Sequence, residues 1–368
     1  MSLSSSLPLL QPAQDVLHGL THALFALPGV AGLDSLHLFF YLPLVLPALA
    51  GLVARPFAER LEPRAATWLL TGVAVVLAGA STVALGVLVV AGLIRVPLVA
   101  VLGHWSLSAV QRGDPVSLLE AAGASVLLTA ATVAAVRLVW RRVRALLAAG
   151  SEAACLPRAG EYVVVDDPAP DAYALPGMPG RVVVSSGMLA ALDEGEREVL
   201  IAHERAHLRA HHYVFVAVTH LAAAANPLLR SLNGAVAYTV ERWADEHAAR
   251  VCGDRRRAAR AVGKAALAAK HAPARNPATA LGIAGLLRRG AHRRPAGSRS
   301  GLRQGDGLRG AGPVPRRVAA LLAPPVPTVM PWGVPWLPLL ALCALLASSG
   351  VCAVAAAHDI HLLLDPNG

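Results

Sequence analysis

The sequence predicts a mainly α, polytopic membrane protein with about four transmembrane helices and one cytoplasmic α+β domain. The chain has 368 residues, is 55 % hydrophobic and has a mean hydropathy of +0.53, which is too apolar for an ordinary soluble domain. Several separate apolar stretches are long enough to cross a bilayer, and basic residues gather on one side of them. That charge bias indicates on which side the polar part of the chain lies.

The four apolar stretches lie at roughly residues 36–54, 67–94, 117–140 and 333–357. A helix of about 20 apolar residues crosses the hydrocarbon core of a bilayer, which is about 30 Å thick. Arginines follow the first and third stretches, and a basic segment precedes the fourth. Because basic residues stay on the cytoplasmic side, both termini are expected outside and residues 141–332 inside. The chain is thus expected to be a multi-pass protein of the cell membrane.

This map divides the chain into five expected parts. The N-terminal membrane region with three transmembrane helices is followed by a cytoplasmic domain, a linker rich in Arg, Gly and Pro, a fourth transmembrane helix and a short external tail. Their bounds are, in order, residues 1–140, 141–284, 285–332, 333–357 and 358–368.

The formal net charge of +10 belongs to one segment. Residues 255–317 carry 14 Arg and 2 Lys against a single acid, Asp306. This segment has no interleaved aromatic residues and no recognised module, so nucleic acid is not expected as a partner. We expect the charge to face the cytoplasm and the anionic surface of the lipid bilayer. The four cysteines form no Cys-x-x-Cys pair and indicate neither a disulfide framework nor a cysteine zinc site.

The most informative motif is His-Glu-Arg-Ala-His at residues 203–207. Residues four apart lie on the same face of a helix, so His203 and His207 can bind one metal ion with two ring nitrogens. Glu204 projects beside that face, where it can take a proton from water at the metal. Asp193 and Glu196 form a capping-box-like start, which places the motif inside a helix.

A third ligand is expected on a second helix downstream. Glu241 and Asp245 are four residues apart in Glu-Arg-Trp-Ala-Asp. The carboxylate of Glu241 would complete a His-His-Glu site and leave a fourth position open, as in catalytic zinc sites. Asp245 could accept the free N–H of a ligand histidine and fix its orientation.

The two motifs together resemble those of membrane zinc metallopeptidases, and are most similar to the M56-type, beta-lactam sensor-transducer and antirepressor-like peptidases. The similarity covers about residues 36–260. It implies a zincin-like metallopeptidase domain in which His203, His207 and Glu241 bind Zn2+ and Glu204 is the general base. It also implies cleavage of a protein or peptide substrate in regulatory proteolysis and signal transduction.

One feature of that family is not expected in this sequence. The sensor-transducers carry an extracellular sensor domain after the last span, whereas about a dozen residues follow Ala357 in this sequence. Either a separate sensor or repressor protein is a partner, or cleavage needs no external signal.

Two other functions fit parts of the sequence. One is a membrane quality-control zinc peptidase, in which spanning segments separate the two ligand helices; residues 208–240 are too few for two spans. The other is a non-catalytic membrane scaffold or regulator with structural histidines. Residues 213–229 could be read as a further span, but a shared metal requires them to be a buried helix or a re-entrant element.

Further residues have expected roles that rest on their position in the sequence. Tyr238, His247 and Arg250 are candidates for a donor that stabilises the oxyanion. His211 and His212 are expected at a solvated helix end. Residues 180–186 are expected to form a strand, which at a sheet edge could pair with a substrate peptide and otherwise is an ordinary interior strand.

Overall fold

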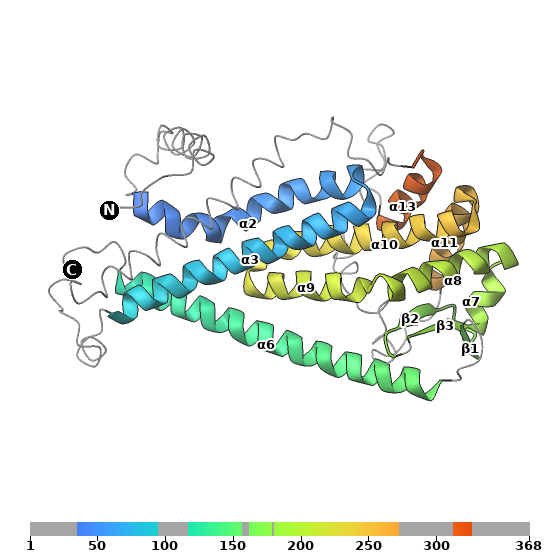
Figure 1. Cartoon of the computed structure of the whole chain (residues 1–368), viewed down its shortest axis with the longest axis horizontal. Coiled ribbons are helices and arrows are strands. Elements are labelled where there is room, and N and C mark those ends of the chain that lie inside the picture. Colours follow the sequence, from blue (N-terminus) through green and yellow to red (C-terminus); the bar gives the residue numbers. More distant parts are fainter. Residues whose placement is uncertain (1–34, 95–116, 157–161, 179, 272–311, 326–368) are drawn as a thin grey trace, which may run out of the picture. The chain divides into compact units, whose positions relative to one another are not determined.

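The computed structural model describes residues 35–94, 117–156, 162–178, 180–271 and 312–325. The described chain is mainly helical, with one small sheet (Figure 1). The expected fourth span, the external tail and most of the expected linker lie outside these residues. The expected division of the chain into five parts therefore stays a prediction.

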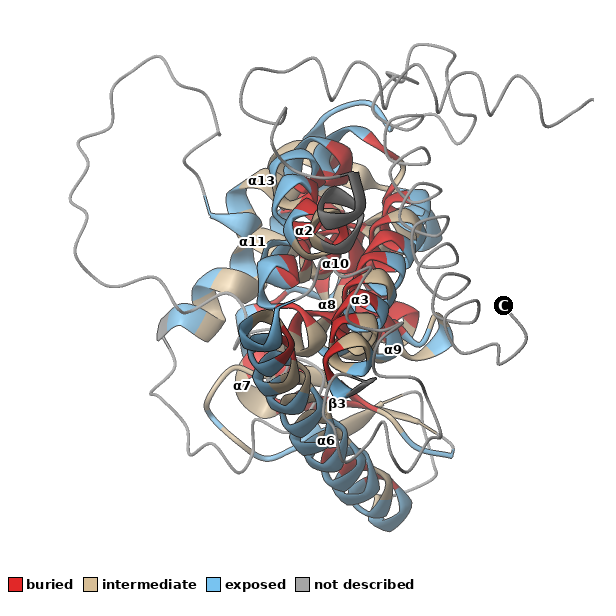
Figure 2. Cartoon of the chain, turned by 90° about the vertical axis from the view of Figure 1, so that its left-hand side faces the viewer, coloured by how far each residue is buried: buried red, intermediate tan, exposed pale blue. Residues whose placement is uncertain are grey.

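Three helices in the N-terminal half are long and apolar enough to cross a membrane: α2 (Ser35–Arg60), α3 (Pro63–Ile94) and α6 (Leu118–Cys155). They contain the first three predicted spans. Helix α6 is mostly exposed along its length (Figure 2), including apolar side chains such as Leu119 and Leu147. Exposed apolar surface of this extent is typical of helices in contact with lipid. Together with the length of the three helices, it indicates a membrane protein.

The chain divides into two compact units, and each of these three helices contributes residues to both. In the unit that contains residues 79–130, the hydroxyl of Tyr41 donates to Glu120 (2.5 Å) and that of Ser81 donates to the carbonyl of Pro43 (2.8 Å). Leu85 and Ala121 belong to its apolar core. Tyr41 and Ser81 thus find polar partners within the apolar helices, as burial away from water favours.

The other unit contains residues 48–78 and the chain after 130. Its sheet has three strands in the order β1-β3-β2: β1 (Val163–Val165) runs parallel to β3 (Arg181–Ser185), and β2 (Ala172–Leu175) runs antiparallel to it. The predicted strand at 180–186 is confirmed as β3, and of the two positions left open by the sequence, edge or interior, it takes the interior one. Strand β3 is central because Val182, Val183 and Val184 are all buried, which suits a strand covered on both sides.

Two helices lead from the sheet to the metal-binding motif. Helix α7 (Ser186–Ala191) is followed by α8 (Glu194–Arg209). The predicted capping box is present: Asp193 accepts from the amide of Glu196 (2.9 Å), and Glu196 accepts from the amide of Asp193 (3.1 Å). These bonds satisfy free amides of the first turn and fix where α8 begins.

The chain then turns back and forms the second ligand helix. Helix α9 (His212–Ala225) and the 3-10 turn η1 (Pro227–Leu229) precede α10 (Arg230–Cys252), which packs along α8. With 14 residues, α9 is about 21 Å long and is shorter than a bilayer core of about 30 Å. The motifs on α8 and α10 are therefore joined by a hairpin with a short helix in it.

Helix α10 is also joined to the turn between α2 and α3. Arg242 is buried, and its Nη1 donates to the carbonyl oxygens of Ala58 (2.8 Å) and Glu59 (3.2 Å). These carbonyls belong to the last turn of α2, the end of a helix that favours a cation. Thr67 of α3 donates to the hydroxyl of Thr239 (2.9 Å). The hairpin of α2 and α3 is thus bonded directly to the helix that carries Glu241.

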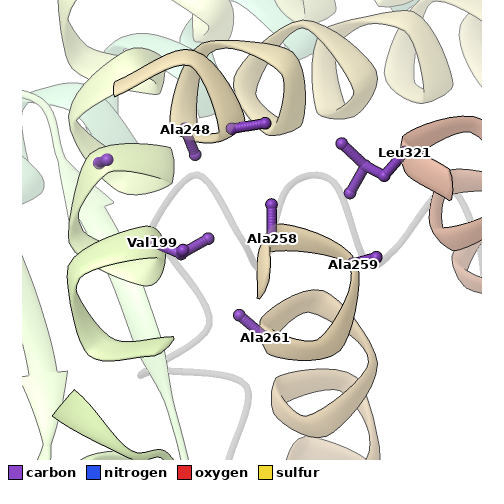
Figure 3. Packing of buried hydrophobic residues seen from close by; sticks show 8 residues of the cluster. Val199, Ala248, Ala258, Ala259, Ala261 and Leu321 are labelled. Atoms are coloured by element: carbon purple, nitrogen blue, oxygen red, sulfur yellow. The ribbon is translucent and has the colours of Figure 1, made fainter. Parts of the chain in front are cut away.

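The last described element lies within the range of the expected linker. Residues 313–322 form helix α13 (Pro313–Leu322). Proline is tolerated in the first turn of a helix, and Leu321 packs into an apolar core with α8, α10 and α11 (Arg255–His271) (Figure 3). Val199, Ala248 and Ala258 line the same core. Packing therefore decides the structure of a segment whose composition suggested none.

Candidate metal centre

Helices α8 and α10 bring the three predicted ligands together. Nε2 of His203 and Nε2 of His207 are 3.1 Å apart, and each lies 3.7 Å from a carboxylate oxygen of Glu241. One ligand atom from each residue lies within 4.8 Å of the other two. The imidazoles are buried and the Glu241 side chain is 21 % exposed, so the group has access to solvent on the side of the carboxylate.

The donor set and its spacing fit zinc. Zinc holds histidine nitrogen and carboxylate oxygen at about 2.0–2.2 Å, which puts neighbouring atoms of a tetrahedron about 3.3 Å apart. The separations of 3.1 and 3.7 Å lie on either side of that value. A two-histidine, one-carboxylate set is also a known catalytic zinc set that leaves a fourth position free. His203, His207 and Glu241 are therefore the residues that could hold the ion.

Glu204 lies next to this group on α8. Burial raises the pKa of Glu204 to about 7, with the charges of Glu241 and Asp171 acting in the same direction and those of His203 acting against it. The backbone amide of Ala174 in β2 is bonded to its carboxylate. A carboxylate with a pKa near the working pH is suited to take a proton and to return it.

Asp245 lies behind His203, as the sequence predicted. Its Oδ1 is 3.0 Å from Nδ1 of His203, and its side chain is only 2 % exposed. Burial disfavours the charged form of His203, but Asp245 and Glu241 outweigh burial and raise the pKa of this imidazole. Burial disfavours the Asp245 carboxylate too, but Arg317 and His203 lower its pKa far below the ordinary range. Asp245 is therefore an anion that can hold the Nδ1–H of His203 and point Nε2 at the metal position.

His207 also has a partner behind its ring, His212, which the sequence did not predict. Nδ1 of His212 lies 2.9 Å from Nδ1 of His207, and His212 is fully buried, so the expectation of a solvated helix end is wrong for this residue. His211 adopts a left-handed conformation (φ 49°) and ends the turn after α8. The chain therefore reverses at once, and the first residue of α9 points inward.

His212 can act on His207 as a neutral imidazole. Burial lowers the pKa of His212 to about 2. If Nε2 of His207 faces the metal, its Nδ1 carries the proton and donates to His212. This bond fixes the tautomer and the ring orientation of His207, which is the usual function of a partner behind a histidine ligand.

We expect His212→Ala to weaken zinc binding by about 10- to 100-fold, the loss typical of removing such a partner. Competition with a chelator of known affinity would measure it in the purified chain. His211→Asn is the matched control, because His211 is the exposed neighbour and asparagine tolerates its left-handed conformation, so this variant should bind zinc as the wild type does. Equal affinities in the two variants would contradict the role given to His212.

The three oxyanion candidates have other contacts in the structure. Arg316 stacks over the ring of Tyr238 (4.4 Å to the centroid), and Nε of Arg250 donates to the carbonyl of Glu246 (3.2 Å). The charges that act most on His247 are those of Arg250 and Arg209. None of these contacts involves a candidate ligand, so the choice among the three stays a prediction.

Comparison with known proteins supports a metallopeptidase. The model of peptidase family M48 matches residues 137–229, which include α7, α8 and α9 with both histidines of the motif. The match indicates a zincin-like metallopeptidase and does not confirm the M56 type expected from the sequence. No curated protein matches the chain. No solved structure matches it either.

Proposed function

We propose that this chain is a membrane-embedded zinc endopeptidase in which His203, His207 and Glu241 hold the metal and Glu204 is the general base. The observation that carries the proposal is the convergence of three donors from two helices beside a partly buried glutamate, Glu204. Two imidazoles on one helix face are common as structural residues, but here a carboxylate from a second helix meets them at the spacing that zinc requires.

Each residue has a defined task in peptide hydrolysis. Zinc, when bound, supplies a Lewis acid for the scissile carbonyl and for water. Glu204 accepts the proton of the attacking water and later gives it to the leaving amine. Asp245 and His212 keep the ligand rings in position. The chemistry therefore needs α8, α9 and α10 in their present arrangement.

Strand β2 is the proposed docking site for the substrate. Within the described residues it lies at an edge of the sheet, and its Ala174 contacts Glu204. An extended peptide that pairs with such an edge is held by main-chain hydrogen bonds, and its carbonyl groups would pass close to the general base. This assigns to β2 the role that the sequence suggested for residues 180–186.

We propose regulatory proteolysis of a cytoplasmic protein or peptide as the biological role. The positive flanks of the apolar helices support a cytoplasmic site. The short hairpin between α8 and α10 supports the M56-type, antirepressor-like assignment over a quality-control peptidase with spanning segments between its ligand helices.

Metal removal tests the proposed activity. The chain purified in detergent should contain one zinc per molecule and cleave an unstructured protein substrate. Treatment with a chelator should abolish cleavage, and added zinc should restore it, because the Lewis acid is lost and regained. A chain without stoichiometric zinc and without cleavage would favour a scaffold or regulator instead, and cleavage that survives removal of the metal would contradict a zinc-dependent mechanism.

A further inference from the structure

Helix α13 delivers an arginine to the candidate metal centre. Nε and Nη2 of Arg317 donate to the two carboxylate oxygens of Asp245, both at 2.7 Å. Nη1 lies 2.7 Å from Oε2 of Glu241. One planar guanidinium therefore bridges the third candidate ligand and the residue behind His203. Bonds of this kind, with both partners charged, are short and directional.

We propose that Arg317 is a positioning residue of the zinc centre, which fixes the Glu241 carboxylate so that Oε2 is held by the guanidinium and Oε1 is left for the metal. The inference rests on the proposed function. Both carboxylate oxygens lie 3.7 Å from a ligand imidazole, Oε1 from Nε2 of His207 and Oε2 from Nε2 of His203, and the guanidinium contact at 2.7 Å distinguishes Oε2 from Oε1. Without a partner for Oε2, the carboxylate could rotate away from the position that a tetrahedral site needs.

The charges of α10 give a second reason for a cation here. Glu241 and Asp245 are like charges four residues apart, an arrangement that destabilises a helix. Their side chains are only 21 % and 2 % exposed, and that of Arg317 is 13 % exposed, so water screens the repulsion poorly. Arg317 offsets this repulsion and holds the two carboxylates side by side on α10.

The position of Arg317 is fixed by contacts on either side of it in α13. Arg316 reaches away from the centre to Glu59 of α2 (2.8 Å) and stacks over Tyr238. At the other end, Leu321 fills the apolar core shared with α8, α10 and α11 (Figure 3). Arg255 of α11 donates to the carbonyls of Ala320 and Leu321 (3.0 Å each). The guanidinium is thus placed by a docked helix.

Zinc affinity of the full chain in detergent tests the inference without any assay of cleavage. A chromophoric chelator would compete for zinc with the wild type and with the variants Arg317→Gln, Arg317→Lys and Arg260→Gln. The dissociation constant of Arg317→Gln should rise by at least about tenfold, as for other partners of metal ligands. Arg317→Lys should lie between it and the wild type, because an ammonium keeps the charge but cannot bridge two carboxylates.

Arg260→Gln is the control, since it removes one positive charge from an exposed position of α11 and keeps the contacts of α13. Its affinity should equal that of the wild type. Unchanged affinity in Arg317→Gln would show a structural contact only, and tighter binding would show that Arg317 competes with the metal; either result overturns the inference. If Arg317→Gln does not fold, wild-type affinity in Arg317→Lys overturns it. A wild type that binds no zinc overturns the proposed function itself, which separates the two failures.

Discussion

Glu204→Gln is expected to keep zinc at wild-type stoichiometry and to lose at least about 100-fold in kcat, the lower end of what a general base contributes. Glutamine has nearly the shape of glutamate and can still accept a hydrogen bond from the amide of Ala174, but its amide cannot take a proton from water. Glu204 is not among the three candidate ligands, so the metal site should be intact. Metal analysis and turnover of an unstructured protein substrate would measure both quantities.

Glu198→Gln is the matched control for this variant. Glu198 lies on the same helix, α8, but faces solvent, so its replacement should leave both zinc content and turnover unchanged. The proposed mechanism predicts a separation of binding from chemistry that a merely destabilised protein would not show. Retained proteolysis in Glu204→Gln would rule out Glu204 as the base.

Glu241→Ala is expected to lose both zinc and activity. The change removes one of three candidate ligands and leaves only the imidazoles of α8, so zinc affinity should fall by more than about 100-fold, beyond the range for partners behind a ligand. Arg317 forms ion pairs with Glu241 and Asp245 in the described structure, and the substitution leaves it the pair with Asp245. Zinc content after dialysis and the dissociation constant from chelator competition would measure the loss.

Excess zinc provides a second measurement on the same variant. If Glu241 is a ligand, millimolar zinc should restore part of the binding but little of the activity, because the ion would be held with the wrong geometry. Glu198→Ala, an exposed carboxylate on α8, should behave as the wild type. Stoichiometric zinc in Glu241→Ala after dialysis would show that the third ligand is another residue.

Local signals in the sequence were sufficient for the helix that carries the histidines. A capping box and a four-residue spacing depend only on neighbours in the chain, and the structure shows both at Asp193 and at His203. The contact between α8 and α10 could be predicted only from the chemistry of the metal. Zinc needs a third protein ligand, and Glu241 lies on a predicted helix downstream, four residues before Asp245.

Other parts of the site depend on packing between distant residues. Arg317 is 72 residues from Asp245, in a segment whose Arg, Gly and Pro content is typical of a linker. Helix α13, which carries Arg317, is stabilised by the packing of Leu321 and by hydrogen bonds from Arg255 of α11. Neither interaction can be predicted from neighbouring residues in the sequence. His212 was misread because a single left-handed residue, His211, reverses the chain. The central position of β3 depends on strand order, which local alternation does not encode.

The bond from Arg242 to the end of α2 limits how this protein can be divided. Its guanidinium is buried and takes its acceptors from Ala58 and Glu59, more than 180 residues earlier in the chain. A fragment made only of residues 141–284 would lose both acceptors together with the helix that carries them. Hydrogen bonds to a charged group contribute about 1.5–3 kcal/mol each, which together is a large part of the stability of an ordinary domain. The catalytic fragment is therefore unsuited to excision as a soluble enzyme, and the first hairpin belongs to its minimal folded unit.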